Sequence, residues 1–72
     1  MNNGVIERDP EIMSGAPVFA GTRVLVADFF DNLAAGDSLE QFLDDFPWVS
    51  RKQAVGVLEM ARDVVLSLAN TG

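Results

Sequence analysis

The chain has 72 residues, of which eleven are acidic and five are basic, and its net charge is −6 at neutral pH. It contains no cysteine and no histidine. Disulfides and thiolate metal sites are therefore excluded, and so are catalysis and metal binding by histidine. Hydrophobic residues make up 49% of the sequence. That share is high for so small a domain and indicates apolar surface that a second copy or a partner covers.

The charge also indicates which partners the chain favours. Nonspecific DNA affinity comes from neutralised phosphates, so a lone acidic domain binds DNA poorly, whereas a basic protein is a better partner. The sequence starts without the basic and apolar segments of a signal peptide. No apolar run approaches the roughly 20 residues that span a bilayer. We expect a cytoplasmic protein with no cofactor and no bound metal.

Short strands are expected in the N-terminal part. Residues 5–8 can form one of them. Residues 18–20 and 23–26 flank the turn-forming pair Gly21 and Thr22, and this arrangement predicts a β-hairpin. Two strands alone are marginal in water, so the hairpin must pack on helices or on another chain. Residues 1–26 are therefore expected to form a β-hairpin arm, and residues 27–69 three helices.

Three helical patterns follow one another. Apolar residues recur on one face at positions 26, 29, 30, 33 and 34, then at 39, 42, 43 and 46, and finally at 54, 57, 58, 61, 65 and 68. Gly36 stands where a left-handed residue commonly ends a helix. Ser38 and Ser50 are each followed three residues later by glutamine, which predicts two capping boxes. Pro47 separates the second helix from the third, and their short turn has the proportions of a helix-turn-helix.

The third helix carries more apolar surface than one core needs. Val55 and Leu66 share one flank, and Met60 and Val64 share the other. Such wide stripes imply burial on more than one side, so we expect homodimerisation through this helix. Gly56 is expected on the outward line, where glycine costs about 1 kcal/mol relative to alanine. Either a partner helix or a phosphate approaches its backbone, or the glycine is a tolerated defect.

Paired carboxylates are the main candidates for catalysis or metal binding. They occur at Asp28 and Asp31 and at Asp44 and Asp45. Metal or acid–base chemistry needs several carboxylates that converge in a concave, partly desolvated place. Here they alternate with apolar positions on the polar faces of short helices. No nucleophile–base pair, phosphate loop or dinucleotide-binding motif occurs, so we do not expect an enzyme.

DNA recognition would fall to the start of the third helix, because the second helix of a helix-turn-helix motif enters the major groove. The candidate residues are Arg51, Lys52, Gln53, Gly56 and, farther along, Arg62. Acidic residues at positions 59 and 63 lie on the same outward line and would repel the phosphate backbone. The same helical arrangement also occurs in proteins that bind no nucleic acid.

Two further side chains are candidates for binding a protein partner. Trp48 lies in the turn between the last two helices. It either folds back over Phe46 and the core, the interpretation we favour, or anchors a partner. Arg23 either pairs with Asp28 or Asp9 as a structural brace, or projects into an acidic pocket of a partner.

Several sequence blocks occur together in one known family. They are Asp-Pro-Glu-Ile at 9–12, Gly-Ala-Pro-Val-Phe-Ala-Gly-Thr-Arg-Val at 15–24, Leu-Ala at 33–34 and Phe-Pro at 46–47, with Ile6, Val26, Gly36, Ser38, Ser50, Gln53, Leu58 and Ala61 at matching positions. From Val5 to about Arg62 the chain thus resembles the "domain of unknown function 433" (DUF433) family of small bacterial and archaeal proteins. The resemblance implies a homeodomain-like helix-turn-helix fold. It also implies an antitoxin of a type II toxin–antitoxin pair, which neutralises a PIN-like ribonuclease toxin and can repress its own operon.

We therefore hypothesise an antitoxin that binds its toxin through folded surfaces or the N-terminal segment, since only three residues follow Ala69. The residues assigned to partner binding are Arg23, Trp48, Val55 and Leu66. The alternative is a free-standing dimeric DNA-binding transcriptional regulator. A third hypothesis is a dimerisation module with neither role.

Overall fold

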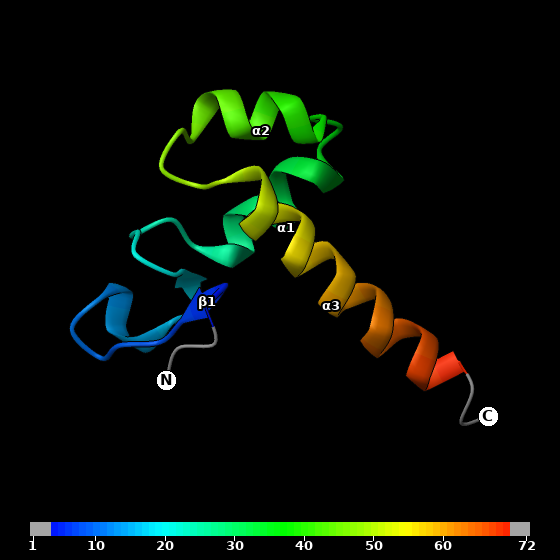
Figure 1. Ribbon diagram of the computed structural model, residues 1–72, viewed down its shortest axis with the longest axis horizontal. Coiled ribbons are helices and arrows are strands. Elements are labelled where there is room, and N and C mark those ends of the chain that lie inside the picture. The colour runs from blue at the N-terminus through cyan, green and yellow to red at the C-terminus, as the bar shows by residue number, and fades with distance from the viewer. Residues whose placement is uncertain (1–3, 70–72) are drawn as a thin grey trace.

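The computed structural model describes residues 4–69 (Figure 1). In chain order these residues form strand β1 (Ile6–Glu7), a short 3₁₀ turn η1 (Met13–Gly15), strand β2 (Val18–Phe19) and helices α1 (Val26–Ala34), α2 (Leu39–Asp45) and α3 (Arg51–Ala69). The described part is thus mainly α, with three helices preceded by a short two-stranded antiparallel sheet, which confirms the expected order of elements. Residues 1–3 of the expected arm and residues 70–72 after α3 lie outside the described residues.

The sheet pairs different strands from those of the predicted hairpin. β1 runs antiparallel to β2, with Ile6 opposite Phe19 and Glu7 opposite Val18. The strand expected within residues 5–8 is therefore present. The strand expected at residues 23–26 is wrong, because that segment makes one isolated bridge, from Leu25 to Val18, and then enters α1.

The turn after β2 explains this difference. The hydroxyl of Thr22 donates to the carbonyl of Phe19 (2.7 Å) and accepts from the N–H of Val24 (3.0 Å). The N–H of Val26 donates to the carbonyl of Pro17 (3.1 Å), and the Val26 side chain is buried in the core. The chain therefore continues with a helical period from Val26, because that period places its apolar face on the core.

A Schellman motif ends α1, as the glycine at this position predicts. Gly36 has φ of +105°, in the left-handed region. Its N–H donates to the carbonyl of Leu33 (3.1 Å), and the N–H of Asp37 donates to the carbonyl of Asn32 (3.0 Å). These two bonds satisfy carbonyls that the end of the helix leaves free, and they turn the chain toward α2.

Serine side chains cap the next two helices. The hydroxyl of Ser38 accepts from the N–H of Gln41, and the hydroxyl of Ser50 accepts from the N–H of Gln53, both at 3.0 Å. Gln53 completes the second capping box, because its Oε1 accepts from the N–H of Ser50 (3.0 Å). The amide of Gln41 instead donates to Asp45 one turn later (3.0 Å). The predicted box is therefore complete at α3 and half-formed at α2.

Three phenylalanines from three elements form the centre of the core. Phe19 of β2, Phe29 of α1 and Phe42 of α2 are each 0% exposed. The centroid of Phe29 lies 4.7 Å from that of Phe42 and 5.6 Å from that of Phe19. Helix α3 closes this core with the buried side chains of Ala54 and Val57 in its first half.

The second half of α3 extends away from the body (Figure 1). The radius of gyration is 12.8 Å, whereas a compact domain of this length averages about 11 Å. Val65 and Leu68, expected to face inward, are 61% and 69% exposed. That part of the prediction is wrong, because within the described residues the rest of the chain covers only the first half of the helix.

Candidate partner-binding site

An open groove of about 660 Å³ lies between the N-terminal loops and the turn from α2 to α3. The turn after β2 forms one side of it, and the residues between α2 and α3 contribute the other. The lining residues are Glu7, Ile12, Gly21, Thr22, Arg23, Val24, Asp28, Phe46 and Trp48. Most of this lining is apolar, and a charged side chain stands at several points around it. This is the composition of a small binding surface on a protein.

Trp48 is 69% exposed at the edge of this groove. The interpretation that its indole folds back over the core is wrong, because the neighbouring Val49 takes the core position and is 4% exposed. Phe46 packs on Phe42 with ring centroids 4.8 Å apart, so the space next to the core is already occupied. The large indole is left facing solvent, beside the half-buried ring of Phe46.

Arg23 is also exposed and lines the same groove. The expected braces to Asp28 or Asp9 do not form, since the ion pairs found within residues 4–69 join Arg51 to Glu40 and the adjacent residues Arg62 and Asp63. Asp9 instead accepts from the N–H of residue 11 (2.9 Å) in the local turn. The structure thus brings Arg23 and Trp48, 25 positions apart in the sequence, to one open surface.

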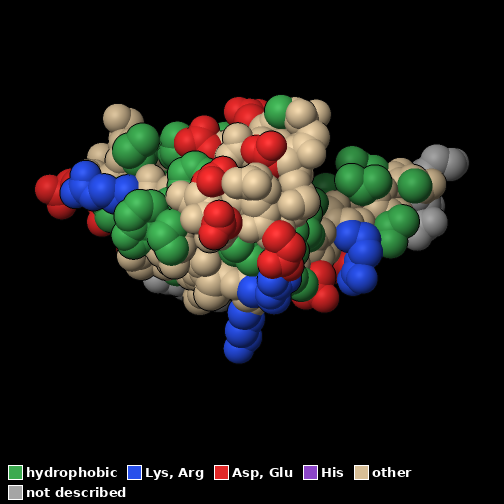
Figure 2. Space-filling model, turned by 90° about the horizontal axis from the view of Figure 1, so that it is seen from above, with side chains coloured by type: hydrophobic (Ala, Val, Ile, Leu, Met, Phe, Trp, Pro, Cys, Tyr) green, Lys and Arg blue, Asp and Glu red, His purple; other side chains and the backbone are tan. Residues whose placement is uncertain are grey.

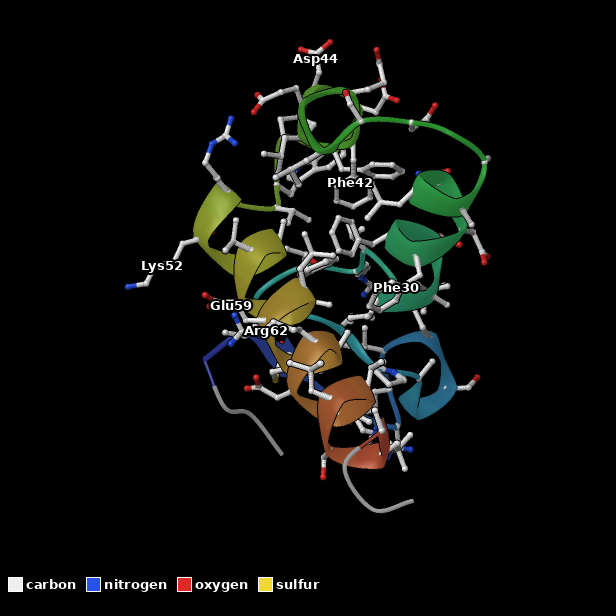
Figure 3. The ribbon with its side chains drawn as sticks, turned by 90° about the vertical axis from the view of Figure 1, so that its right-hand side faces the viewer. Phe30, Phe42, Asp44, Lys52, Glu59 and Arg62 are labelled. Carbon is white, nitrogen blue, oxygen red and sulfur yellow. The ribbon has the colours of Figure 1, made fainter. Side chains whose placement is uncertain are left out.

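The candidate DNA-binding residues at the start of α3 are largely engaged within the chain. The guanidinium of Arg51 pairs with Glu40 of α2. Besides capping α3, the side-chain amide of Gln53 donates to the carbonyl of Ala20 (2.9 Å). Lys52 is exposed and points away from the body (Figure 3). Of these side chains, that of Lys52 is the one directed into solvent without a contact to the body.

Gly56 does not lie on an outward face. A Cβ atom placed on Gly56 would lie 3.3 Å from Cγ2 of Val5. The predicted close approach to its backbone therefore exists, but it comes from the N-terminal segment of the same chain. A neighbour so distant in sequence gives no local signal, so periodicity alone placed this glycine on the wrong side.

The remaining partner candidates lie elsewhere on α3. Val55 is half-buried, and Leu66 is 53% exposed. Their spacing of eleven residues puts them on one flank of the helix, as expected, and neither lines the groove. Sequence reasoning missed Ile12, Thr22 and Val24 as groove residues, because only the tertiary structure places these loop positions together.

The carboxylates predicted to lie on solvated faces are exposed, and Asp28, Asp31, Asp44 and Asp45 make no cluster. Within residues 4–69, no group of three or more carboxylates comes together in a way that could hold a metal ion. No helix in this part of the chain is both long and apolar enough to cross a membrane.

Comparisons with known proteins agree with the resemblance that the sequence blocks indicated. The sequence pattern of the family described as "Protein of unknown function (DUF433)" matches residues 6–61. The chain is also 42% identical over 43 residues to the uncharacterized protein y4eO of Sinorhizobium fredii (strain NBRC 101917 / NGR234). That match covers 60% of this chain and 20% of y4eO, so the chain spans about one fifth of this relative. No solved structure matches the chain.

Proposed function

This chain belongs to the DUF433 family, and on that premise we propose that it is the antitoxin of a type II toxin–antitoxin pair. It acts in the cytoplasm by binding a PIN-like ribonuclease and blocking its activity. Its second and third helices form the helix-turn-helix of a homeodomain-like domain. In this role the chain is a binding protein, which acts through the surface that contacts its partner.

The groove that carries both Arg23 and Trp48 is the observation that best supports this role. Tryptophan and arginine are the residues most enriched among those that dominate protein interfaces. Here both are exposed on one surface, beside apolar groove residues that a partner can cover. Exposing an indole to water has no benefit for the isolated domain, so the arrangement favours a protein partner that buries it.

The charges fit a nuclease as that partner. A ribonuclease needs a basic surface for the phosphates of RNA, and the net charge of −6 attracts such a surface. Carboxylates that hold catalytic metal ions form an acidic pocket within it. The guanidinium of Arg23 is placed to enter that pocket, since none of the described carboxylates holds it in an ion pair.

The test is co-expression with the product of the neighbouring gene, followed by pull-down and a ribonuclease assay. We expect a complex in which the ribonuclease is inhibited. Trp48→Ala and Arg23→Ala should each weaken binding at least about 30-fold, the loss typical of a dominant interface residue. Arg62→Ala is the matched control, because Arg62 is an exposed arginine outside the groove, and it should bind like the wild type. Absence of a complex, or full inhibition by Trp48→Ala, would rule the proposal out.

Repression of its own operon is a second role, and the exposed Lys52 at the first turn of α3 favours it. The isolated chain offers few phosphate contacts there, since Arg51 is paired with Glu40. We therefore expect the complex with the basic partner to shift operator DNA at lower concentration than the isolated chain does. If the isolated chain alone binds the operator tightly, loses affinity with salt and depends on Lys52, the alternative of a free-standing dimeric transcriptional regulator is correct instead.

A further inference from the structure

One apolar stripe on α3 continues beyond the body of the domain. It comprises Val57, Ala61, Val64, Val65 and Leu68, which the spacing of the helix places on one face. Val57 is 3% exposed in the core, whereas Val64, Val65 and Leu68 are 59%, 61% and 69% exposed. The stripe that closes the core of the domain thus continues as a largely exposed apolar surface within residues 4–69, and a second core can form on this distal part.

A groove lies beside this stripe and belongs to the same surface. It has a volume of about 340 Å³ and is bounded by Ile6, Val26, Phe30, Met60, Ala61 and the exposed valines of α3. All of its lining side chains are apolar. Phe30 is 38% exposed on its wall, where α1 faces α3 (Figure 3). The surface therefore presents both a ridge, the distal half of α3, and a hollow beside that ridge.

The accessible surface of the chain is larger than its mass predicts. A folded monomer of 7.8 kDa exposes about 4,400 Å² on average, whereas this chain exposes 4893 Å². The exposed apolar side chains on the distal half of α3 contribute to this surplus.

The lack of net charge on this face favours a second copy over a basic partner. Residues 64–69 carry no charge, and the adjacent Arg62 and Asp63 neutralise each other in an ion pair. Acidic side chains gather over the body, whereas apolar ones mark the end of α3 (Figure 2). Two chains of net charge −6 can therefore join here without bringing like charges into contact, whereas a basic nuclease would find no opposite charge here.

We infer that a second copy of this chain covers the distal half of α3, with the two α3 helices antiparallel and related by a two-fold axis between Val64 and Val65. Residues 61 and 68 are then equally far from the axis, each about 5 Å along the helix. Leu68 of one copy thus lies level with Ala61 of the other. The small side chain of Ala61 leaves room for the leucine, which enters the groove beside Phe30. The same contact forms twice, as a two-fold interface requires.

The first test is the mass of the isolated chain in solution, measured by sedimentation equilibrium across a range of concentrations. We expect a mass twice the 7.8 kDa of the chain. Leu68→Glu should weaken the dimer at least tenfold, because it buries an unpaired charge at the interface. Leu66→Glu is the matched control, since Leu66 is also exposed but lies on the opposite flank of the helix, and it should remain a dimer.

Crosslinking provides a measurement that does not depend on disrupting the interface. Because the chain contains no cysteine, Val65→Cys introduces a single thiol next to the proposed axis. Mild oxidation should join two copies of this variant, whereas Leu66→Cys should stay largely unlinked. A monomeric wild type, an intact dimer of Leu68→Glu, or equal crosslinking of the two cysteine variants would overturn the inference.

These measurements need no nuclease and do not involve the groove of Arg23 and Trp48. A monomeric chain that still inhibits its partner would overturn the dimer alone. A dimer that binds no partner would overturn the proposed antitoxin role alone.

Discussion

Val5 and Gly56 are in close contact: a Cβ atom on Gly56 would lie 3.3 Å from one γ-methyl of Val5 and 3.5 Å from the other. The carbonyl of Val5 also accepts from the N–H of Ala20 (2.9 Å), next to the β1–β2 pair. The missing side chain at position 56 therefore lets the N-terminal segment and its small sheet lie directly on α3. This contact joins the N-terminal segment to the first half of α3.

A double-mutant cycle between these two positions tests that contact. Alanine is favoured over glycine within a helix by about 1 kcal/mol, but in the wild type the added methyl group meets Val5. We expect Gly56→Ala to gain much less than this, and to gain nearly the full amount when Val5→Ala has removed the obstruction. The measurement is urea unfolding followed by circular dichroism. Equal gains in the two backgrounds would mean that Val5 and Gly56 do not touch.

Removing the ring of Phe42 should unfold the domain. Phe42 is 0% exposed and packs against the rings of Phe19, Phe29 and Phe46. Phe→Ala at such a site costs about 3–5 kcal/mol, which equals the roughly 3–5 kcal/mol that a core of this size supplies. We expect Phe42→Ala to lose most of its helical signal at 25 °C. Phe30→Ala, at a position 38% exposed, should stay folded, and similar losses from the two changes would contradict the described core.

The two glutamines that follow the capping serines should differ in importance. Gln53 joins the start of α3 to the turn after β2, through bonds to the N–H of Ser50 and the carbonyl of Ala20. Gln41 reaches only Asp45 on the exposed face of its own helix. We expect Gln53→Ala to cost about 1–3 kcal/mol and Gln41→Ala about 0.2–0.5 kcal/mol, as measured by chemical unfolding. Equal costs would show that the bond to Ala20 contributes little.

Trp48 should behave as a solvated indole. It is the single tryptophan of the sequence and is 69% exposed, so the intrinsic fluorescence reports on it alone. We expect emission typical of an indole in water and strong quenching by acrylamide. Trp48→Ala should change the free energy of unfolding by no more than about 0.5 kcal/mol, as surface substitutions usually do. A blue-shifted, poorly quenched emission from the isolated chain would restore the interpretation that the indole covers the core.

Helix boundaries could be predicted from the sequence because they depend on neighbours within a few positions. Gly36 ends α1, Ser38 and Ser50 start the helices that follow, and Pro47 separates them, as expected. Each of these residues acts on backbone groups at most four positions away, through a cap, a left-handed conformation or a missing N–H. The family resemblance likewise rested on blocks of adjacent residues.

Contacts between distant segments could not be predicted in this way. Apolar spacing showed that residues 23–26 and the far end of α3 carry apolar side chains, but not that residues 6–7 take the place of residues 23–26 in the sheet, nor that the far end of α3 extends beyond the body. The sequence likewise did not show that Arg23 and Trp48 line the same groove, because these residues are distant in the chain.

The sequence by itself therefore determined the local structure of this protein: three capped helices and the apolar face of each, in an acidic chain without cysteine or histidine. Only the tertiary structure decided that Val5 packs on Gly56, that Trp48 faces solvent, and that the apolar stripe of α3 continues beyond the core of the domain. The physical reason is that a helical period shows which face of a segment avoids water, whereas what covers that face depends on chain segments far away in the sequence.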